Sequence, residues 1–244
     1  MRELPGPPQS DQWLKNRVGR ITGSRMAEVM NVLTRKSKSG DIGEPGAKRI
    51  NYRRELVAER ILGRAASHFV TRYMEEGAER EDEARSMYTL ATHQMVIPCG
   101  FVLHPIFDFS GATPDGLVGD DGLLEIKSPK AETLVEWLDT REVPDEYKKQ
   151  CQWEMVCCER QWADFYGWYP GMPHFFKRLD RDSKLIAEME AEAEKLHLEV
   201  EMFLAKNGLP PTVWNDPVEI PISAYDSDRS FADNCAFIGE EIIP

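Results

Sequence analysis

The chain has 244 residues, 41% of them hydrophobic, which is enough to bury a substantial core and is ordinary for a globular protein. Its formal net charge of −12 disfavours a protein that coats nucleic acid, although a local basic groove on an acidic body is compatible with it. The sequence has no apolar run of about 18 residues and no apolar signal-peptide core, so we expect no membrane span and a cytoplasmic location.

The cysteines indicate a reducing compartment. Their odd number favours free thiols over a disulfide framework, and their spacings match no zinc motif. We therefore expect five reduced, structural cysteines: Cys99, Cys151, Cys157, Cys158 and Cys235.

The first third of the chain predicts mainly helices. The segment WLKNRVGRITGSRMAEVMNVL predicts two helices with a short break at Thr22–Ser24, and Ser24 as the N-cap of the second. The polar, glycine-rich segment TRKSKSGDIGEPGAK predicts a loop. Helical patterning then covers roughly residues 48–63 and 74–91.

Strands and further helices are expected in the rest of the chain. The segment from Gln94 to Ser128 has short β-rich runs separated by turn residues. Helical patterning returns at roughly 131–139, 145–160 and 182–207, and ADFYGWYP and HFFKRLD predict two more strands. This order indicates an α/β or α+β core with a central sheet between helical layers.

We expect a single domain over residues 1–211. No internal repeat or low-complexity block divides the sequence. Residues 212–244 are acidic and weakly periodic, so we expect them to form an extended arm or tail.

The stretch ATPDGLVGDDGLLEIKSPK at residues 112–130 predicts a β-hairpin with two different faces. Glu125 and Lys127 are two residues apart and share one face of a strand, whereas Leu124 and Ile126 face the other way. The apolar face belongs to the core, so the charged face must meet solvent or a functional site.

The turn of this hairpin decides where Asp115 lies. A two-residue turn at 120–121 would pair Asp115 with Ile126, whereas a three-residue loop at 119–121 would place it opposite Glu125. We predict the three-residue loop. Two carboxylates at strand distance repel each other unless a cation lies between them, and hard divalent cations prefer such oxygen ligands.

A third carboxylate could join this pair. Glu81 falls on the same helix face as Gly77, Ala84 and Tyr88, so it points toward the core side. An unpaired carboxylate is expensive there. Glu81 could pair with an arginine or help to complete a metal site. The plainer alternative, for the hairpin residues alone, is a solvent-exposed hairpin with a Glu125–Lys127 salt bridge.

Four motifs in fixed order resemble a known family. They are W-x3-R-x3-ITGS from Trp13 to Ser24, G-x3-E-x2-AR from Gly77 to Arg85, PDGL followed by LEIK, and Y-x2-Q-x-Q from Tyr147 to Gln152. Pro114-Asp115 with Glu125-Ile126-Lys127 is similar to the signature of the PD-(D/E)XK nucleases. The set and its order resemble lambda exonuclease and its YqaJ-type viral recombinase relatives, over roughly residues 11–170.

The resemblance implies a restriction-endonuclease-like core with a central mixed β-sheet, and a role for each matched residue. Asp115, Glu125 and the backbone carbonyl of Ile126 would hold two Mg²⁺ ions, which Mn²⁺ could replace. Glu81 would be a direct or water-mediated ligand. Lys127 would orient or help to deprotonate the attacking water.

The resemblance also implies how the substrate is held. Gln150 would support the water and the scissile phosphate. Arg17 and Ser24 would bind the terminal 5′-phosphate, with Ser24 starting a helix whose free amides favour an anion. Without the family motifs, Ser24 would be an ordinary helix cap and Arg17 a surface charge.

The implied function is a Mg²⁺-dependent, double-strand-specific 5′→3′ exonuclease that releases 5′-mononucleotides and leaves 3′ overhangs. It would act in phage or prophage recombination beside a single-strand annealing protein, as a ring-shaped homotrimer around DNA. Alternatives are another nuclease with the same core, such as an endonuclease or a 3′→5′ enzyme, an inactive DNA-binding recombination partner, and an acidic α/β protein without this activity.

Overall fold

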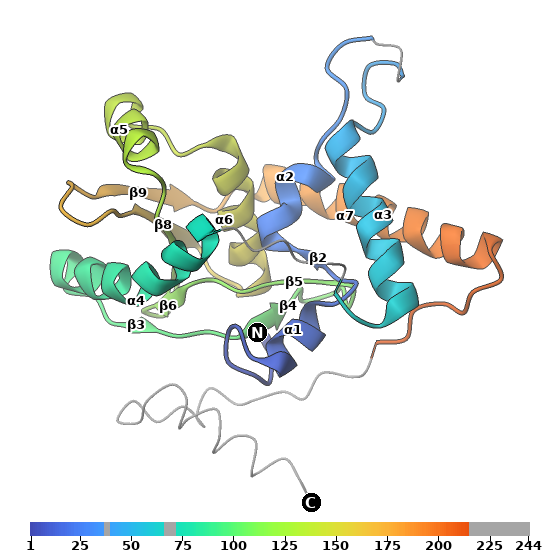
Figure 1. Cartoon of the computed structure of the whole chain (residues 1–244), viewed down its shortest axis with the longest axis horizontal. Helices are drawn as coiled ribbons and strands as arrows, with labels where there is room; N and C mark the ends of the chain where they lie inside the picture. The colour runs from blue at the N-terminus through green and yellow to red at the C-terminus, as the bar shows by residue number, and fades with distance from the viewer. Residues whose placement is uncertain (37–39, 66–71, 215–244) are drawn as a thin grey trace, which may run out of the picture.

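A computed structural model describes residues 1–36, 40–65 and 72–214 of the chain. It is a mixed α/β fold with helices on its sheets, as expected, and its strands divide between two mixed sheets (Figure 1). The helices are α1 (Asp11–Arg17), α2 (Met26–Val29), α3 (Ala47–Leu62), α4 (Arg72–Thr92), α5 (Ala131–Thr140), α6 (Asp145–Cys157) and α7 (Ser183–Lys206). A short 3-10 turn, η1 (Gly23–Arg25), precedes α2.

The smaller sheet has four short strands in the order β1-β4-β5-β2. These strands are β1 (Arg2–Leu4), β2 (Ile21–Thr22), β4 (Phe101–Leu103) and β5 (Ser110–Ala112). Strand β5 pairs antiparallel with β4 and parallel with β2. The sheet therefore brings the N-terminal segment alongside the strand that leads into the predicted hairpin.

The larger sheet has the order β3-β6-β7-β8-β9. Its strands are β3 (Val96–Ile97), β6 (Gly116–Val118), β7 (Gly122–Lys127), β8 (Trp162–Gly167) and β9 (Phe175–Asp180). Strands β7 and β8 are parallel and are joined by the segment that contains α5 and α6. The other pairs are antiparallel.

Helix α6 connects the two sheets. It contacts β5 of the smaller sheet and both β7 and β8 of the larger one, and it also packs against η1, α2 and α7. Figure 1 shows it in the middle of the molecule, with α4 and α5 on one side and α3 and α7 on the other. Every residue from Gln150 to Cys157 is buried. Its amphipathic pattern is therefore weak, because a helix enclosed on all sides needs no polar face.

The hydrophobic core follows this arrangement. Trp153 of α6 is fully buried in the largest apolar cluster, with Phe165 of β8 and Leu196 of α7. A smaller cluster joins Tyr88 of α4 to Leu124 of β7. Helix α4 thus covers the face of the larger sheet that carries the apolar residues of the hairpin.

The N-terminal helix prediction was partly wrong. Ile21 and Thr22 form strand β2, paired with Ser110 and Gly111, instead of ending a helix. The tertiary pairing overrides the helical pattern, and two β-branched residues fit a strand well. The next helix, α2, has four residues and Arg25 as its N-cap, without a side-chain cap. Ser24 lies inside η1, so its prediction as a helix N-cap is also wrong.

Most other predictions of secondary structure are confirmed. The helices expected near 48–63, 74–91, 131–139, 145–160 and 182–207 correspond to α3 to α7, and the two late strands to β8 and β9. The β-rich segment contains β3 to β7. Strand β1 was not predicted. Most of the expected acidic tail, residues 215–244, lies outside the described residues.

Two further expectations concern the cysteines and the membrane. Four cysteines are buried free thiols, namely Cys99, Cys151, Cys157 and Cys158, and Cys235 lies outside the described residues. Among the described helices, none has both the length and the apolar character needed to cross a bilayer.

Candidate active site

The β6–β7 hairpin has the predicted three-residue loop. Gly116 pairs with Leu124 and Val118 with Gly122, which leaves residues 119–121 as the loop. Gly119 adopts a left-handed φ of 54°, a conformation that glycine accepts readily. Asp115 follows in register opposite Glu125, so both carboxylates lie at the same end of the hairpin.

Asp115 is held by the backbone of the opposite strand. Its Oδ2 accepts a hydrogen bond of 2.6 Å from the amide of Ile126. Burial and the nearby charge of Glu125 raise the pKa of Asp115 to about 7, and Lys127 partly offsets them. Two acids placed this close share negative charge unfavourably, as expected for groups that bind a cation.

Glu125 and Lys127 form an ion pair, and it is not a solvent-exposed one. The ammonium of Lys127 lies on Glu125 Oε1, and the Glu125 side chain is only 1% exposed. Burial alone would lower the pKa of Lys127, but the charges of Glu125 and Asp115 and the bond to Glu125 outweigh it and raise that pKa. The alternative of an exposed hairpin is therefore wrong, and Lys127 is a firmly held cation.

Glu81 reaches the same site from α4. Its Oε1 accepts a 2.6 Å hydrogen bond from Arg85, which also donates to the backbone carbonyl of Asp115. Burial and the charge of Asp115 raise the pKa of Glu81 to about 7, against the effect of Arg85. The predicted arginine partner is thus Arg85. It attaches Glu81 to the hairpin without removing it from the acidic cluster.

Gln150 joins the hairpin to α6. Its amide nitrogen Nε2 donates to Glu125 Oε1 at 2.6 Å and to Glu154 Oε1 at 2.8 Å. Glu154 was missed in the sequence, although it lies four residues after Gln150 and therefore on the same helix face. It is 1% exposed, and burial together with the charge of Glu125 raises its pKa well above the usual range.

The donor set fits a hard divalent cation. Glu125 Oε2 is buried and has no hydrogen-bond partner among the described residues, so one ligand oxygen is free. Asp115 and Glu81 supply further carboxylates, and burial together with the charge of a neighbouring acid raises the pKa of each. Within residues 1–36, 40–65 and 72–214, no three acidic, histidine or cysteine side chains are already gathered into a metal cage. Binding would therefore require side-chain adjustment that brings further carboxylate oxygens to Glu125 Oε2.

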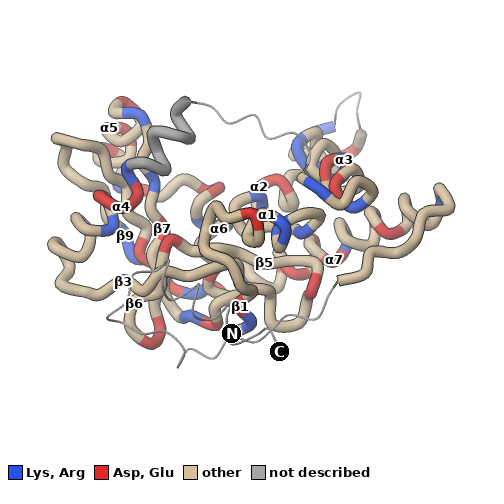
Figure 2. Tube along the Cα trace, turned by 60° about the horizontal axis from the view of Figure 1, so that its bottom comes forward, with Lys and Arg blue, Asp and Glu red and all other residues tan. Residues whose placement is uncertain are grey.

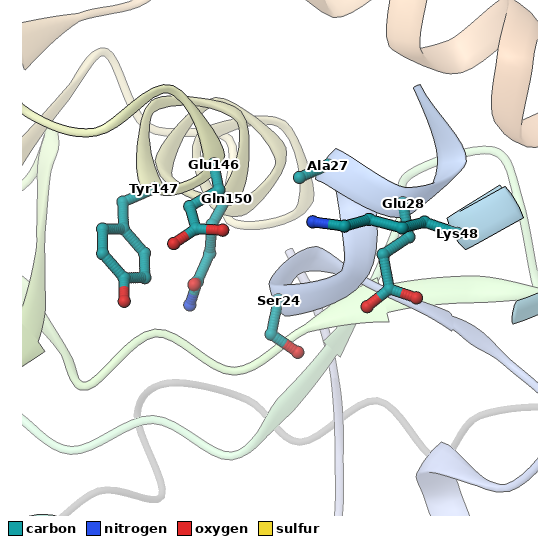
Figure 3. Close-up of a pocket in the computed structure, with 7 residues that line it drawn as sticks. All are labelled: Ser24, Ala27, Glu28, Lys48, Glu146, Tyr147 and Gln150. Atoms are coloured by element: carbon teal, nitrogen blue, oxygen red, sulfur yellow. The ribbon is translucent and has the colours of Figure 1, made fainter. Parts of the chain in front are cut away.

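A pocket of about 210 Å³ opens beside Gln150. It lies where η1 and α2, the start of α3 and the start of α6 meet (Figure 3). Lys48 extends across it from α3 toward α6. Ser24 is on its wall, so the structure brings this predicted end-binding residue to the same pocket as Gln150. The lining residues are Ser24, Ala27, Glu28, Lys48, Glu146, Tyr147 and Gln150.

Ser24 and Arg17 differ in how they are held. Ser24 Oγ lies 3.4 Å from Thr22 Oγ1. The Arg17 guanidinium stacks on the Trp13 ring, 4.2 Å from its centroid, and has no hydrogen bond to another described residue. Burial lowers the pKa of Arg17. Its donors are thus free, although Arg17 does not line the pocket that contains Ser24.

Trp13, on which Arg17 stacks, is bonded to the segment that leads into the hairpin. Its Nε1 donates a 2.9 Å hydrogen bond to Thr113 Oγ1, two residues before Asp115. Arg25, the nearest arginine to Ser24 in sequence, is instead occupied by Glu28 and Glu55. Helix α3 carries both basic and acidic residues (Figure 2), and Lys48 at its start has no ion pair with another described residue.

Comparisons with known proteins identify the family of the chain. The model of the YqaJ-like viral recombinase domain matches residues 12–161, which include every predicted site residue. The chain belongs to this family. No curated protein matches it.

Solved structures of two proteins are informative. An alkaline exonuclease from Laribacter hongkongensis is 36% identical, with a TM-score of 0.71, over 82% of this chain and 98% of that one. The same exonuclease in complex with dAMP matches equally well. A phage-related exonuclease from Haemophilus somnus 129PT is 14% identical, with a TM-score of 0.58, over 77% of this chain and 96% of that one, and supports the fold alone. Family and fold thus support a nuclease.

Proposed function

We propose that the chain is a Mg²⁺-dependent exonuclease that degrades one strand of double-stranded DNA in the 5′→3′ direction. It releases 5′-mononucleotides and leaves 3′ overhangs for phage-type recombination by single-strand annealing. The observation that carries the proposal is the convergence of Asp115, Glu125, Lys127 and Gln150 on one buried cluster beside a pocket. The exonuclease relative with 36% identity supports the same reaction class.

The acidic side chains would hold the metal. Asp115, Glu125 and the Ile126 carbonyl are the proposed ligands of two Mg²⁺ ions, which Mn²⁺ can replace, with Glu81 bound directly or through water. When bound, such ions activate water and stabilise the leaving oxygen of a phosphodiester. The unpartnered Glu125 Oε2 and the raised pKa values of Asp115 and Glu81 support this assignment.

Lys127 and Gln150 act on the reacting groups. Lys127 is held as a cation by Glu125 and Asp115, so its first role is to orient the attacking water and balance the charge of the phosphate. Gln150 holds Glu125 through its amide nitrogen and lines the pocket. It therefore supports the water and the scissile phosphate from the side of α6.

Arg17 and Ser24 would hold the 5′-phosphate. The free guanidinium of Arg17 can bind a phosphate with two parallel hydrogen bonds. Ser24 supplies a hydroxyl from the wall of the pocket that also contains Gln150. Since Ser24 begins no helix of useful length, its contribution is the hydroxyl itself and not a helix terminus.

The assembly belongs to the same proposal. A homotrimeric ring around DNA would confine positive charge to its inner lining, which reconciles DNA binding with a net charge of −12. The partner would be a single-strand annealing protein, in the cytoplasm of a bacterial host of the phage. Residues 1–211 would form the nuclease domain and residues 212–244 an acidic tail.

The test is digestion of a linear DNA duplex with a 5′-phosphate on one strand only. We expect wild type with Mg²⁺ to remove the phosphorylated strand and release mononucleotides, and Lys127→Ala to lose at least about a hundredfold in rate. Lys206→Ala, at the far end of α7, is the matched control and should retain activity.

Three results would contradict the proposal. Cleavage of covalently closed circles indicates an endonuclease, and shortening of both strands from their 3′ ends indicates a 3′→5′ enzyme. DNA binding without cleavage by wild type indicates an inactive recombination partner.

A further inference from the structure

The side-chain amide of Gln150 is held by two carboxyl groups. Nε2 donates one hydrogen to Glu125 Oε1 and the other to Glu154 Oε1, at 2.6 and 2.8 Å. An amide nitrogen has two hydrogens and accepts none, so both of its bonds are used. The carbonyl oxygen of Gln150 has no hydrogen-bond partner among the described residues, and the side chain lines the pocket.

This pattern fixes which end of the amide faces the pocket. An amide rotated by half a turn would point its carbonyl oxygen at the Glu125 carboxylate, which offers it no hydrogen and repels it. Glu125 alone would permit some rotation, because a single acceptor can be reached by either hydrogen. The second acceptor, on the same helix as Gln150, removes that freedom.

Glu154 is enclosed by the structure around this contact. Its side chain is 1% exposed, and its second oxygen, Oε2, has no hydrogen-bond partner in the described chain. A methyl group at Gly23 would lie 3.7 Å from Glu154 Cγ, so η1 packs against the carboxylate stem. A buried acid with one bond is costly and contributes little to stability. A contribution to folding therefore does not account for an acid at this position.

We propose that Glu154 is a positioning residue that sets the amide of Gln150 with its carbonyl oxygen toward the pocket, as an acceptor for the attacking water. The inference rests on the proposed function, in which Gln150 lies beside the reacting groups. Glu154 itself touches neither water nor phosphate in this assignment. Its effect on the reaction passes through Gln150.

Three variants test the inference by kinetics on duplex DNA. Glu154→Leu removes the acceptor, so kcat should fall about ten- to a hundredfold while KM stays within about threefold. Glu154→Gln keeps an acceptor oxygen and should stay within about threefold of wild type. Gln152→Leu is the matched control: Gln152 is equally buried on α6, but it bonds only the backbone of Asp180 and Asp182. It should lower the thermal midpoint and leave kcat unchanged.

A second readout does not depend on catalysis. With glutamine-selective isotope labelling, the side-chain amide of Gln150 can be followed by NMR and assigned by its loss in Gln150→Ala. Glu154→Leu should shift one of its two amide hydrogens and speed its exchange with water, and Glu154→Gln should restore both. Glu154→Met replaces the leucine variant if the latter does not fold.

The outcomes separate the two proposals. If wild type does not digest DNA, the proposed function fails, while the amide signals still test Glu154. If Glu154→Leu leaves kcat or the amide signals unchanged, or Glu154→Gln is as impaired as Glu154→Leu, the positioning role is overturned. If Glu154→Leu lowers kcat only in proportion to the fraction unfolded, Glu154 is structural.

Discussion

Ile126 donates its backbone amide to Asp115 Oδ2 at 2.6 Å, across the two strands of the β6–β7 hairpin. This bond holds Asp115 beside the end of strand β7, where Glu125 and Lys127 lie. The positions of three proposed catalytic groups therefore depend on a single backbone register. A change that shifts the register moves all of them together.

Gly122 should be sensitive for this reason. A methyl group at Gly122 would overlap the ring of Trp162 on strand β8. We expect Gly122→Ala to lower the free energy of unfolding by about 1–3 kcal/mol through overpacking, and to reduce nuclease activity with it. Gly119→Ala meets no neighbouring atom and introduces only backbone strain, of about 1 kcal/mol. Urea unfolding should show a larger loss of unfolding free energy for Gly122→Ala than for Gly119→Ala, and equal losses would contradict this prediction.

The stability of the protein in chelator should fall as pH rises toward neutrality. Asp115 and Glu81 have pKa values raised to about 7, so the folded state binds more protons than the unfolded state between about pH 4 and 7. Their contribution is complete below about pH 4 and is lost as pH passes 7. Between about pH 6 and 8 we expect a loss on the order of 1 kcal/mol per group.

Asp115→Asn isolates this effect. Burial lowers the pKa of His104 and of His197 to about 4, so these groups destabilise the fold at acid pH and work in the opposite direction. Both histidines are present in wild type and in Asp115→Asn, so their effect cancels in the difference between the urea midpoints of the two proteins. Magnesium at about pH 8 should stabilise wild type more than the variant. Parallel pH profiles would rule out the raised pKa of Asp115.

Arg17 should decide how strongly a 5′-phosphate is preferred. Its guanidinium is stacked on Trp13 with free donors, and lysine cannot reproduce two parallel hydrogen bonds. We expect Arg17→Ala and Arg17→Lys to reduce the ratio of kcat/KM for 5′-phosphate over 5′-hydroxyl duplexes by about tenfold or more. Rates on the two ends, measured side by side, check this. An unchanged ratio with a lower rate would indicate a packing role only.

Lys48 should contribute to DNA affinity without affecting chemistry. It crosses the pocket beside Gln150 and has no ion pair with any described residue. We expect Lys48→Ala to weaken duplex binding in chelator about three- to tenfold and to reduce the slope of log affinity against log salt by about one. Lys206→Ala is the control for a lost surface charge. Identical salt slopes would show that Lys48 contacts no phosphate.

Much of the proposed catalytic cluster could be predicted from the sequence because its geometry is local. A period of two placed Glu125 and Lys127 on one face, and the loop length set Asp115 opposite Glu125. Glu81 could be assigned to the inner face of α4 by helical spacing. In each case the spacing of the residues in the sequence determines which face of the strand or helix they share, with little dependence on long-range packing.

The errors have tertiary causes. The helix predicted to begin at Ser24 is shortened because β2 pairs with β5 and Arg25 turns to Glu28 and Glu55. Glu154 was missed because an acid in a helix normally indicates a solvated face, and only the packing of α6 between two sheets shows it to be buried. The pocket that contains both Ser24 and Gln150 was also not predictable, because it forms where η1, α2, α3 and α6 meet in the fold.

Helix α6 packs at once against η1, which carries Ser24, and against β7, which carries Glu125 and Lys127. If Ser24 binds the 5′ end of a DNA strand and the hairpin residues hydrolyse it, helix α6 fixes the distance between the binding site and the catalytic residues. The number of nucleotides removed in each hydrolysis would then be set by the packing of this helix and not by the sequence of the DNA.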